Sequence, residues 1–453
     1  MTPSSTTDIV HLHPIDNICV AARSLAAGAE IECNGLTISL SNAIPQGHKV
    51  AVSAIARDEP VRKYGQTIGF ATESIRSGDW VHSHNLAMGE INRDYASASE
   101  TPPPPLPIEG RTFQGYRRAS GRAGTRNYIA VISSVNCSAS VAKTMARRFD
   151  VSQLKAYPNV DGVIALAHSS GCGMQFEGPM HQMLNRVMGG MARHPNVGAC
   201  LLVGLGCEQA SLEHLIGDQN LVRITGTPGD GNGPPVFSMQ DCGGTAKTVD
   251  AGVRQIVEML PLVNDVQRES IPASEIILAT ECGGSDGSSG ITANPAVGVA
   301  SDRIVACGGT TILAETTEIF GAEHLLTRRA RSEAVAEKLL ERIRWWQWYT
   351  SIFGAELDNN PSLGNKQGGL TTIAEKSLGA VAKAGSTALV DVYQYSEPVT
   401  AKGFVVMDTP GFDPPSVTGM VAGGANVVVF TTGRGSCFGC KPTPSIKVAT
   451  NTL

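Results

Sequence analysis

Apolar, strand-like runs alternate with longer amphipathic segments beyond residue 111, and this pattern constrains the fold more than any other feature. The expected strands are Tyr128–Ser133, Gly162–Ala167, Ala199–Val203, Ile276–Ala279, Thr311–Ala314, Ala388–Val392, Phe404–Met407 and Val427–Phe430. The expected helices are Ser140–Phe149, Met180–Ala192, Thr245–Met259, Ala334–Trp348, Thr372–Lys383 and Pro415–Ala422. Such alternation is typical of parallel sheets covered by helices on both faces. Because one sheet would be too small for so long a region, we expect an α/β fold with two lobes, 111–268 and 269–453.

The first hundred residues have a different character, with short β-rich runs separated by Gly and Pro turns. The expected strands are Asn17–Ala21, Gly35–Leu40, Lys49–Ala54, Thr67–Ala71 and Trp80–His84. This pattern predicts a small all-β domain over residues 1–98. The stretch Thr101–Pro107 contains five prolines, which favours an extended linker over residues 99–110.

Composition excludes several classes of function. Charged residues make up 17% of the chain, the net charge is −5, and there is no basic block, so nucleic acid is not an expected partner. No apolar stretch approaches the roughly 18 residues that a membrane span needs. The eleven cysteines are an odd number spread over a long chain, which favours free thiols or metal ligands over disulfides. We therefore expect a cytoplasmic protein.

A glycine-rich polar loop, Glu281–Pro295, follows the apolar run Ile276–Ala279. Its reactive side chains are those of Glu281, Cys282, Ser285, Asp286 and Asn294. A loop between a strand and a helix is a usual ligand-binding place in an open α/β domain. Glycines let the backbone approach a small polar molecule closely. The loop therefore indicates a binding site for such a molecule.

Thiols and acids follow several of the other predicted strands. Cys137, Cys172, Cys207 and Cys282 each come just past a strand, and Glu315 and Glu318 follow the strand Thr311–Ala314. The carboxyl ends of parallel strands share one edge of a sheet, so we expect these groups to converge. Thiolates bind iron or an iron–sulfur cluster, although the spacings match no common ferredoxin pattern. A buried packing role for each cysteine is the alternative.

Two histidines close the predicted β domain. His82 and His84 are two residues apart, and in a strand such positions point to the same face. Both imidazoles could then reach one divalent ion, and Glu315 or Glu318 could complete a two-His-one-carboxylate set that suits Fe(II) or Mn(II). The alternative is that the pair lies on a solvated face.

Three cationic side chains lie in polar, glycine-containing loops. Arg434 lies between two glycines, where its planar fork could grip a substrate carboxylate. Arg126, in the segment Gly124–Asn127, could provide a second such grip. Lys366 lies in the loop Asn360–Leu370 before a helix and is either a functional group or a surface lysine.

The motifs around these residues resemble those of the altronate/galactarate dehydratase family, whose relatives include sulfolactate sulfo-lyase. They are Lys63–Gly65, Trp80–Leu86, Gly124–Tyr128, Glu281–Pro295, Glu315–Glu318, Asn360–Leu370, Glu375–Gly379, Met407–Gly411 and Thr432–Ser436. The resemblance runs from about residue 15 to the end. It implies that residues 1–98 form a β-clip (SAF-like) domain.

The resemblance also implies hydro-lyase chemistry on sugar acids that depends on Fe(II) or Mn(II). Water would leave C2 and C3 of a hexonate or hexarate, giving a 2-keto-3-deoxy acid. The developing enediolate is dianionic, so a metal ion, Arg or Lys must stabilise it. We expect catalytic groups among Glu281, Glu315, Glu318 and Lys366, substrate-binding groups among Ser285, Asp286, Asn294, Arg126 and Arg434, and metal ligands in His82 and His84.

Two other functions stay open at this point. One is a lyase that expels sulfite from sulfolactate, or a dehydratase of a smaller hydroxy acid. The other is a non-catalytic sugar-acid-binding protein on the same fold. In each case we expect a small-molecule ligand and a homo-oligomer.

Overall fold

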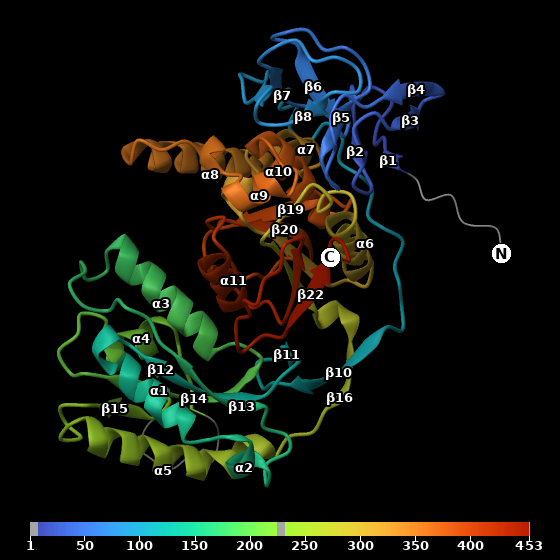
Figure 1. The fold of residues 1–453 in the computed structure, drawn as a ribbon. Helices are drawn as coiled ribbons and strands as arrows, with labels where there is room; N and C mark the ends of the chain where they lie inside the picture. Colours follow the sequence, from blue (N-terminus) through green and yellow to red (C-terminus); the bar gives the residue numbers. More distant parts are fainter. Residues whose placement is uncertain (1–7, 224–231, 453) are drawn as a thin grey trace.

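Three folded parts follow one another in the computed structural model, which describes residues 8–223 and 232–452. A β domain lies at the top of Figure 1, the second α/β lobe below it, and the first α/β lobe at the bottom. The predicted α/β class is therefore confirmed. Within the described residues, no helix is both long and apolar enough to cross a membrane.

The β domain is built only from antiparallel strands. They are β1 (Ile9–Val10), β2 (Ile18–Ala21), β3 (Glu30–Cys33), β4 (Leu36–Ser39), β5 (Lys49–Ala51), β6 (Pro60–Lys63), β7 (Gln66–Ala71), β8 (Trp80–Val81) and β9 (Leu86–Ala87). They form three small sheets with the orders β1-β2-β5-β8, β3-β4 and β6-β7-β9. Apolar side chains of β2, β5 and β7 join a core that continues into the second lobe.

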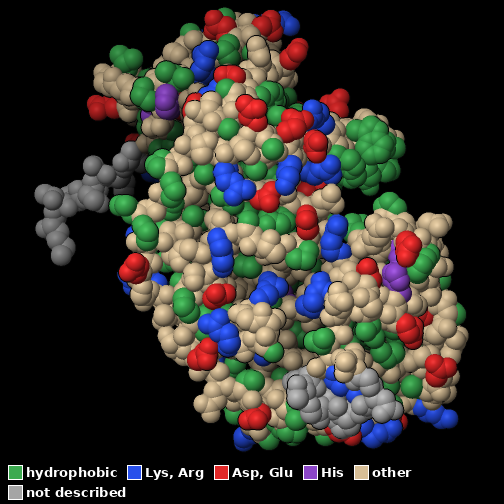
Figure 2. Space-filling view, turned by 180° about the vertical axis from the view of Figure 1, so that it is seen from behind, with side chains coloured by type: hydrophobic (Ala, Val, Ile, Leu, Met, Phe, Trp, Pro, Cys, Tyr) green, Lys and Arg blue, Asp and Glu red, His purple; other side chains and the backbone are tan. Residues whose placement is uncertain are grey.

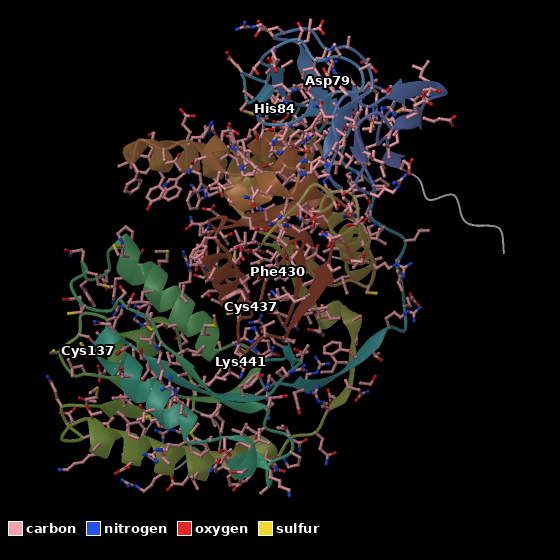
Figure 3. All side chains as sticks on the ribbon, viewed as in Figure 1. Asp79, His84, Cys137, Phe430, Cys437 and Lys441 are labelled. Carbon is pink, nitrogen blue, oxygen red and sulfur yellow. The ribbon has the colours of Figure 1, made fainter. Side chains whose placement is uncertain are left out.

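The last predicted strand of this domain is shorter than expected. Strand β8 ends at Val81, and His82 begins a turn that the Asn85 amide holds by accepting the His82 backbone N–H at 2.9 Å. His84, labelled in Figure 3, lies within this turn. The strand alternation that would place His82 and His84 on one face is therefore absent, and that part of the prediction is wrong.

The first lobe is a four-stranded parallel sheet of order β13-β12-β14-β15. Its strands are β12 (Tyr128–Ser133), β13 (Gly162–Leu166), β14 (Val197–Gly204) and β15 (Val236–Ser238), and its helices are α1 (Ala139–Arg147), α2 (Val151–Leu154), α3 (Pro179–Ala192), α4 (Leu212–Asp218) and α5 (Thr245–Asn264), with the 3₁₀ turn η1 (Asn136–Ser138). Ile129 and Val131 pack with α1 and α5, whereas Ala130 and Ile132 pack with α3 and α4. Alternate residues of one strand thus bury both faces of the sheet.

The second lobe is a six-stranded parallel sheet of order β19-β20-β18-β17-β21-β22. Its strands are β17 (Ile277–Cys282), β18 (Thr310–Leu313), β19 (Leu389–Tyr393), β20 (Gly403–Met407), β21 (Val427–Thr432) and β22 (Ser445–Ala449). Its helices are α6 (Ala293–Ala306), α7 (Glu323–Arg328), α8 (Glu333–Ile352), α9 (Leu363–Gln367), α10 (Ile373–Val381) and α11 (Asp413–Ala422), with the 3₁₀ turns η2 (Ala273–Glu275), η3 (Thr316–Glu318), η4 (Leu357–Asn359) and η5 (Ala382–Ala384). Val428 of β21 and Val417 of α11 share one core cluster, and Phe404 of β20 and Leu339 of α8 share another.

Two connections join the three parts. The proline-rich linker runs along the second lobe, where the backbone N–H groups of Ala98 and Ile108 donate to the carbonyls of Thr327 and Ala306. After the linker, β10 (Thr112–Arg117) pairs with β11 (Ala123–Gly124) and with β16 (Glu269–Pro272) in one small antiparallel sheet. The linker is therefore extended, as predicted, but it is bonded to the lobe rather than free.

The surface mixes acidic and basic side chains without a large patch of one sign on the face shown in Figure 2. This distribution agrees with the small net charge of −5. Aromatic rings gather over the end of α8, at the upper right of Figure 2. They include the exposed Trp348 and Phe353.

A buried ion cluster fixes the β domain to the second lobe. Glu375 of α10 lies 2.8 Å from the ammonium nitrogens of both Lys49 and Lys63, and all three side chains have no exposed surface. Burial alone would raise the pKa of Glu375, but the two ammonium groups lower it well below its usual range. The carboxylate is therefore ionised and bridges β5, β6 and α10.

We predict that Glu375→Gln destabilises the protein by about 3 kcal/mol or more, because two buried ammonium groups would face a neutral amide. Denaturation midpoints in urea would measure the change. Glu269→Gln is the matched control, because Glu269 pairs with Arg117 on the surface at 3.3 Å, where such a pair is worth less than about 1 kcal/mol. Equal shifts for the two variants would contradict the prediction.

Candidate active site

Acids, a thiol and lysines meet at the carboxyl edge of the six-stranded sheet. Cys282 ends β17, Glu315 follows β18, and Asp413 opens α11 after β20. Arg434 follows β21. The central strands β18, β17 and β21 are neighbours, so their ends bring these side chains together.

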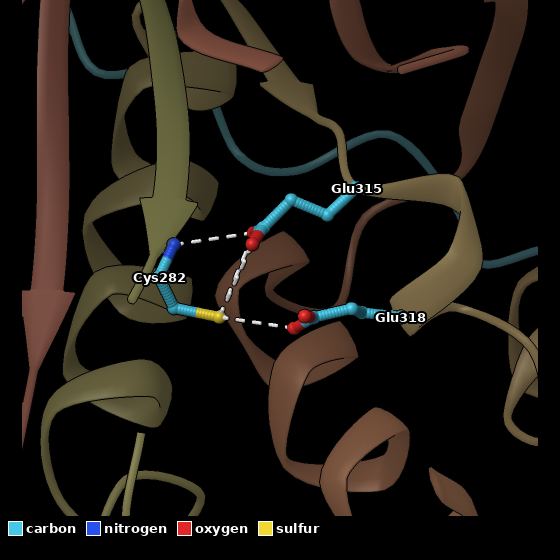
Figure 4. A group of neighbouring side chains, drawn as sticks. All are labelled: Cys282, Glu315 and Glu318. Atoms are coloured by element: carbon cyan, nitrogen blue, oxygen red, sulfur yellow. Dashed lines mark hydrogen bonds between the residues drawn. The ribbon is translucent and has the colours of Figure 1, made fainter. Parts of the chain in front are cut away.

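Cys282, Glu315 and Glu318 form the centre of this group (Figure 4). The Cys282 backbone N–H donates to Glu315 Oε2 at 3.1 Å. The Cys282 thiol points at both carboxylates, with Sγ 3.5 Å from Glu315 Oε2 and 3.9 Å from Glu318 Oε2. Burial, and then the charge of Glu315, raise the pKa of Cys282, so the sulfur is a protonated thiol that donates to the carboxylates.

Glu315 has a strained backbone at the point where it enters this group. Its φ is +61°, in the left-handed region that non-glycine residues rarely adopt. Two bonds to Thr409 hold this conformation: Glu315 N–H donates to Thr409 Oγ1 at 2.7 Å, and Thr316 N–H donates to the Thr409 carbonyl at 3.0 Å. Strain of this kind is found where a side chain must be aimed for function.

Two lysines, which sequence reasoning did not select, neutralise the carboxylates. Lys383 Nζ lies 2.6 Å from Glu315 Oε2 and 2.8 Å from Cys282 Sγ. Lys376 Nζ lies 2.7 Å from Glu318 Oε1 and donates to the Asn360 amide oxygen at 2.9 Å. The two lysines are seven residues apart in one predicted helix, and this spacing, which puts them on one face, could have identified them.

Glu281 lies one residue before Cys282 and is fully buried. Its Oε2 accepts from Ser416 Oγ at 2.8 Å, and its Oε1 has no hydrogen-bond partner among the described residues. Burial, and then the charge of Glu315, raise the pKa of Glu281 well above its usual value. Glu281 thus holds its proton more tightly than an exposed carboxyl group would.

A cavity of about 420 Å³ opens in front of these residues. It is lined by Cys282, Gly283, Gly284, Glu318, Asn359, Asn360, Ser362, Gly364, Asn365, Lys376, Gly411, Asp413 and Arg434. Its size is in the range of small-molecule sites. A larger cavity of about 790 Å³ lies at the opposite, amino-terminal edge of the sheet against the linker prolines, away from the strand ends where α/β sheets bind ligands.

Asp413 and Arg434 also line the cavity but are more exposed than Cys282 and Glu318. Burial, and then the charge of Glu318, raise the pKa of Asp413. The exposed Arg434 donates its backbone N–H to the Gly284 carbonyl at 2.8 Å, which holds its loop against the glycine-rich loop.

The other residues predicted in the glycine-rich loop are not among those that line the cavity. Asp286 accepts from Ser289 and Thr450. Asn294 donates to the Gly379 carbonyl at 2.9 Å and accepts from Thr431. The Ser285 hydroxyl is buried and has no hydrogen-bond partner among the residues that the structure describes.

The arginine, lysine and histidine residues that were predicted for the site do not all lie at the cavity. Arg126 lies in the first lobe, 3.8 Å from Asp161, so the structure does not bring it to the cavity. The Lys366 carbonyl is 2.8 Å from His82 Nε2, and Lys366 is not among the cavity-lining residues. The rings of His82 and His84 each lie against Trp80, and their metal binding stays a prediction.

A divalent ion fits this site poorly as the residues stand. In the described parts of the chain, the one group of three candidate ligand atoms within 4.8 Å of one another is Cys282, Glu315 and Glu318. Carboxylates suit Fe(II) or Mn(II), but the Lys383 ammonium already bridges Cys282 and Glu315, and Lys376 binds Glu318. A dication would have to displace a buried ammonium group. The lysines therefore occupy the place that a metal ion would need in this cavity.

Titration of Glu315 should make the free energy of unfolding depend on pH. Burial, opposed by Lys383, raises its pKa from 4.5 to about 7, so the folded protein holds this proton more tightly than the unfolded chain. Its contribution to the free energy of unfolding should fall as the pH rises from about 4.5 to about 7 and be level outside that window. Glu315→Gln, which cannot titrate, should remove this fall.

Urea denaturation midpoints at about pH 5 and about pH 7.5 would test this effect. The exposed acid Glu341 provides the control variant Glu341→Gln, which should keep the wild-type pH dependence. An unchanged pH dependence in Glu315→Gln would show that Glu315 does not titrate in this window.

Comparison with known protein families assigns each part of the chain. The SAF domain of altronate/galactarate dehydratase matches residues 7–89. The second domain of D-galactarate dehydratase/altronate hydrolase matches residues 115–264, and the C-terminal domain of D-galactarate/altronate dehydratase matches residues 273–453. The three matches follow the order of the β domain, the first lobe and the second lobe.

Curated relatives match over most of their length. An altronate dehydratase from Bacillus subtilis is 36% identical over 98% of this chain and 86% of its own length. A galactarate dehydratase (L-threo-forming) from Escherichia coli is 38% identical over 99% of this chain and 86% of its own. The beta subunit of a (2R)-sulfolactate sulfo-lyase from Chromohalobacter salexigens is 32% identical over 76% of this chain and 84% of its own. The chain therefore belongs to the altronate/galactarate dehydratase family of hydro-lyases.

Proposed function

We propose that the cavity at the edge of the six-stranded sheet removes water from C2 and C3 of a six-carbon sugar acid and yields a 2-keto-3-deoxy acid. The observation that carries this proposal is the buried lysine–carboxylate group that opens into a polar cavity next to Arg434. The similarity to an altronate dehydratase and a galactarate dehydratase supports a sugar acid as the substrate.

The first chemical problem is the charge of the enediolate that forms when the C2 proton leaves. Lys376 lines the cavity and is nine-tenths buried, so its ammonium would stabilise this charge far more than in water. Arg434 would hold the substrate carboxylate through its planar fork. Glu318, beside Lys376, would take the C2 proton.

The second problem is the departure of hydroxide from C3. Asp413 has a raised pKa and lines the cavity on the side of Gly283. A protonated Asp413 would give its proton to the leaving oxygen, so that water leaves and a C2–C3 double bond forms. The enol then becomes the 2-keto acid when C3 takes a proton and the enol hydroxyl gives one up, so that product and released water together contain all the atoms of the substrate.

Dependence on Fe(II) or Mn(II), which the family resemblance implies, stays a prediction for this chain. The proposed proton transfers and charge stabilisation use only the ammonium, guanidinium and carboxyl groups of the cavity.

A sulfite-expelling reaction is the second candidate, because the sulfo-lyase subunit matches 84% of its own length. Its chemistry has the same beginning, the loss of a proton next to a carboxylate. It differs in the leaving group, which is sulfite in place of hydroxide. A non-catalytic binding role is disfavoured, because binding alone does not need the strained backbone of Glu315 or the raised pKa of Glu281.

Keto-acid formation from a panel of hexonates, hexarates and sulfolactate would test the proposal. We predict turnover of a hexonate or hexarate, and a fall in kcat of about 100-fold or more in Lys376→Met, which keeps the side-chain stem and loses the ammonium. Lys155→Met, at an exposed position of the first lobe, should leave kcat unchanged. Turnover of sulfolactate alone would favour the second candidate, and wild-type kcat in Lys376→Met would contradict the role of Lys376.

A further inference from the structure

Cysteines follow all four parallel strands of the first lobe. Cys172 comes after β13, Cys137 after β12, and Cys207 after β14. Cys242 comes after β15. Because the strands are parallel neighbours, the four residues lie at one edge of the sheet. In Figure 3 the label of Cys137 marks this edge.

The loops that carry Cys137, Cys172 and Cys207 are bonded to one another. The first two are joined by Asn136 N–H, which donates to the Ser170 carbonyl at 2.8 Å. The second and third are joined by Ala210 N–H, which donates to the Gly171 carbonyl at 3.1 Å. The first and third are joined by the hydroxyl of Ser134, which donates to Glu208 Oε1 at 2.7 Å. Each loop therefore contacts the other two.

Glycine makes this close approach possible. A Cβ on Gly171 would lie 2.3 Å from the Ser134 carbonyl oxygen, and the Gly171 φ is +95°, so only glycine fits there. Gly206, next to Cys207, has a φ of +119°. Its backbone N–H donates to Glu208 Oε2 at 2.7 Å, which fixes the turn that presents Cys207.

The three thiols are exposed, unlike most packing cysteines. Cys137, Cys172 and Cys207 are exposed, whereas Cys19, Cys33, Cys200 and Cys282 are buried. Burial in a core therefore does not explain the three. All eleven cysteines are free of disulfides.

The predicted fourth member of the group, Cys282, is elsewhere. It lies buried in the second lobe, where Lys383 and Glu315 are its partners. The expectation that all four thiols share one edge is therefore wrong for Cys282. Two lobes with two separate sheets give two separate edges.

We propose that Cys137, Cys172 and Cys207 hold an iron–sulfur cluster at the carboxyl edge of the first-lobe sheet. Thiolates from the chain are the usual ligands of such clusters. A single tetrahedral zinc ion needs sulfurs roughly 3.8 Å apart, since Zn–S is about 2.3 Å. Among the described residues, no group that contains these three thiols has its ligand atoms within 4.8 Å of one another, so the three sulfurs are too far apart for one zinc ion.

The fourth thiol of the edge lies one strand further out. The Cys242 loop is bonded to the β14 side, where Gln240 N–H donates to the Leu205 carbonyl at 3.0 Å. Within the described residues, no backbone hydrogen bond joins it to the loops of Cys137 or Cys172. The cluster therefore takes three thiolates from this chain.

Full-length protein purified without oxygen, or reconstituted with iron and sulfide, tests the proposal. Iron and acid-labile sulfide should be present in equal amounts, with the brown colour of a cluster. Cys137→Ser, Cys172→Ser and Cys207→Ser should each lose most of both. Circular dichroism would confirm that the variants are folded.

Cys307→Ser is the matched control, because Cys307 is a partly exposed thiol at the end of α6 in the other lobe, and it should keep both contents. Protein without iron and sulfide after reconstitution, zinc in place of iron, or equal loss in Cys307→Ser would each overturn the proposal. Because iron and sulfide are measured without substrate, this result is independent of the proposed reaction.

Discussion

The buried pairing of Glu375 with Lys49 and Lys63 is the constraint on which the architecture around the cavity depends. Three ionised groups without exposed surface are stable only when their geometry is maintained, because separation leaves uncompensated buried charge. The pairing therefore fixes the position of α10 against the β domain. Lys376 is the next residue of α10, and Lys383 follows at its end, so the same constraint positions both site lysines.

The cavity obtains its chemistry from an alternation of charges at the ends of parallel strands. Lys383 neutralises Glu315, Lys376 neutralises Glu318, and the thiol of Cys282 lies between the two carboxylates. Because each charge has a partner, the group can be buried without a large net penalty. The cavity-facing members can then act on a substrate in surroundings of low dielectric.

Much of the fold could be predicted because hydrophobic patterns report burial directly. The expected strand Tyr128–Ser133 coincides with β12, and the thiol at the end of β17 and the acid that follows β18 do converge. Strand ends were less predictable. Trp80–His84 was expected as a strand, but β8 stops at Val81 because Asn85 caps a turn there.

The rest of the site could not be predicted because it depends on tertiary positions. The seven-residue spacing of Lys376 and Lys383 puts them on one helix face, but only the packing of α10 and η5 shows that this face meets the acids. Arg126 has the residue type of a carboxylate ligand but lies in the other lobe. The separation of Cys282 from the other thiols likewise follows from the division into two sheets.

The most direct test of the proposed reaction is the fate of the proton at C3. Dehydration through an enol returns a proton from solvent to C3 of the product. Turnover of the accepted sugar acid in D₂O, followed by NMR of the isolated keto acid, should therefore show deuterium at C3. Product that carries no deuterium at C3 would contradict dehydration through an enol in this cavity.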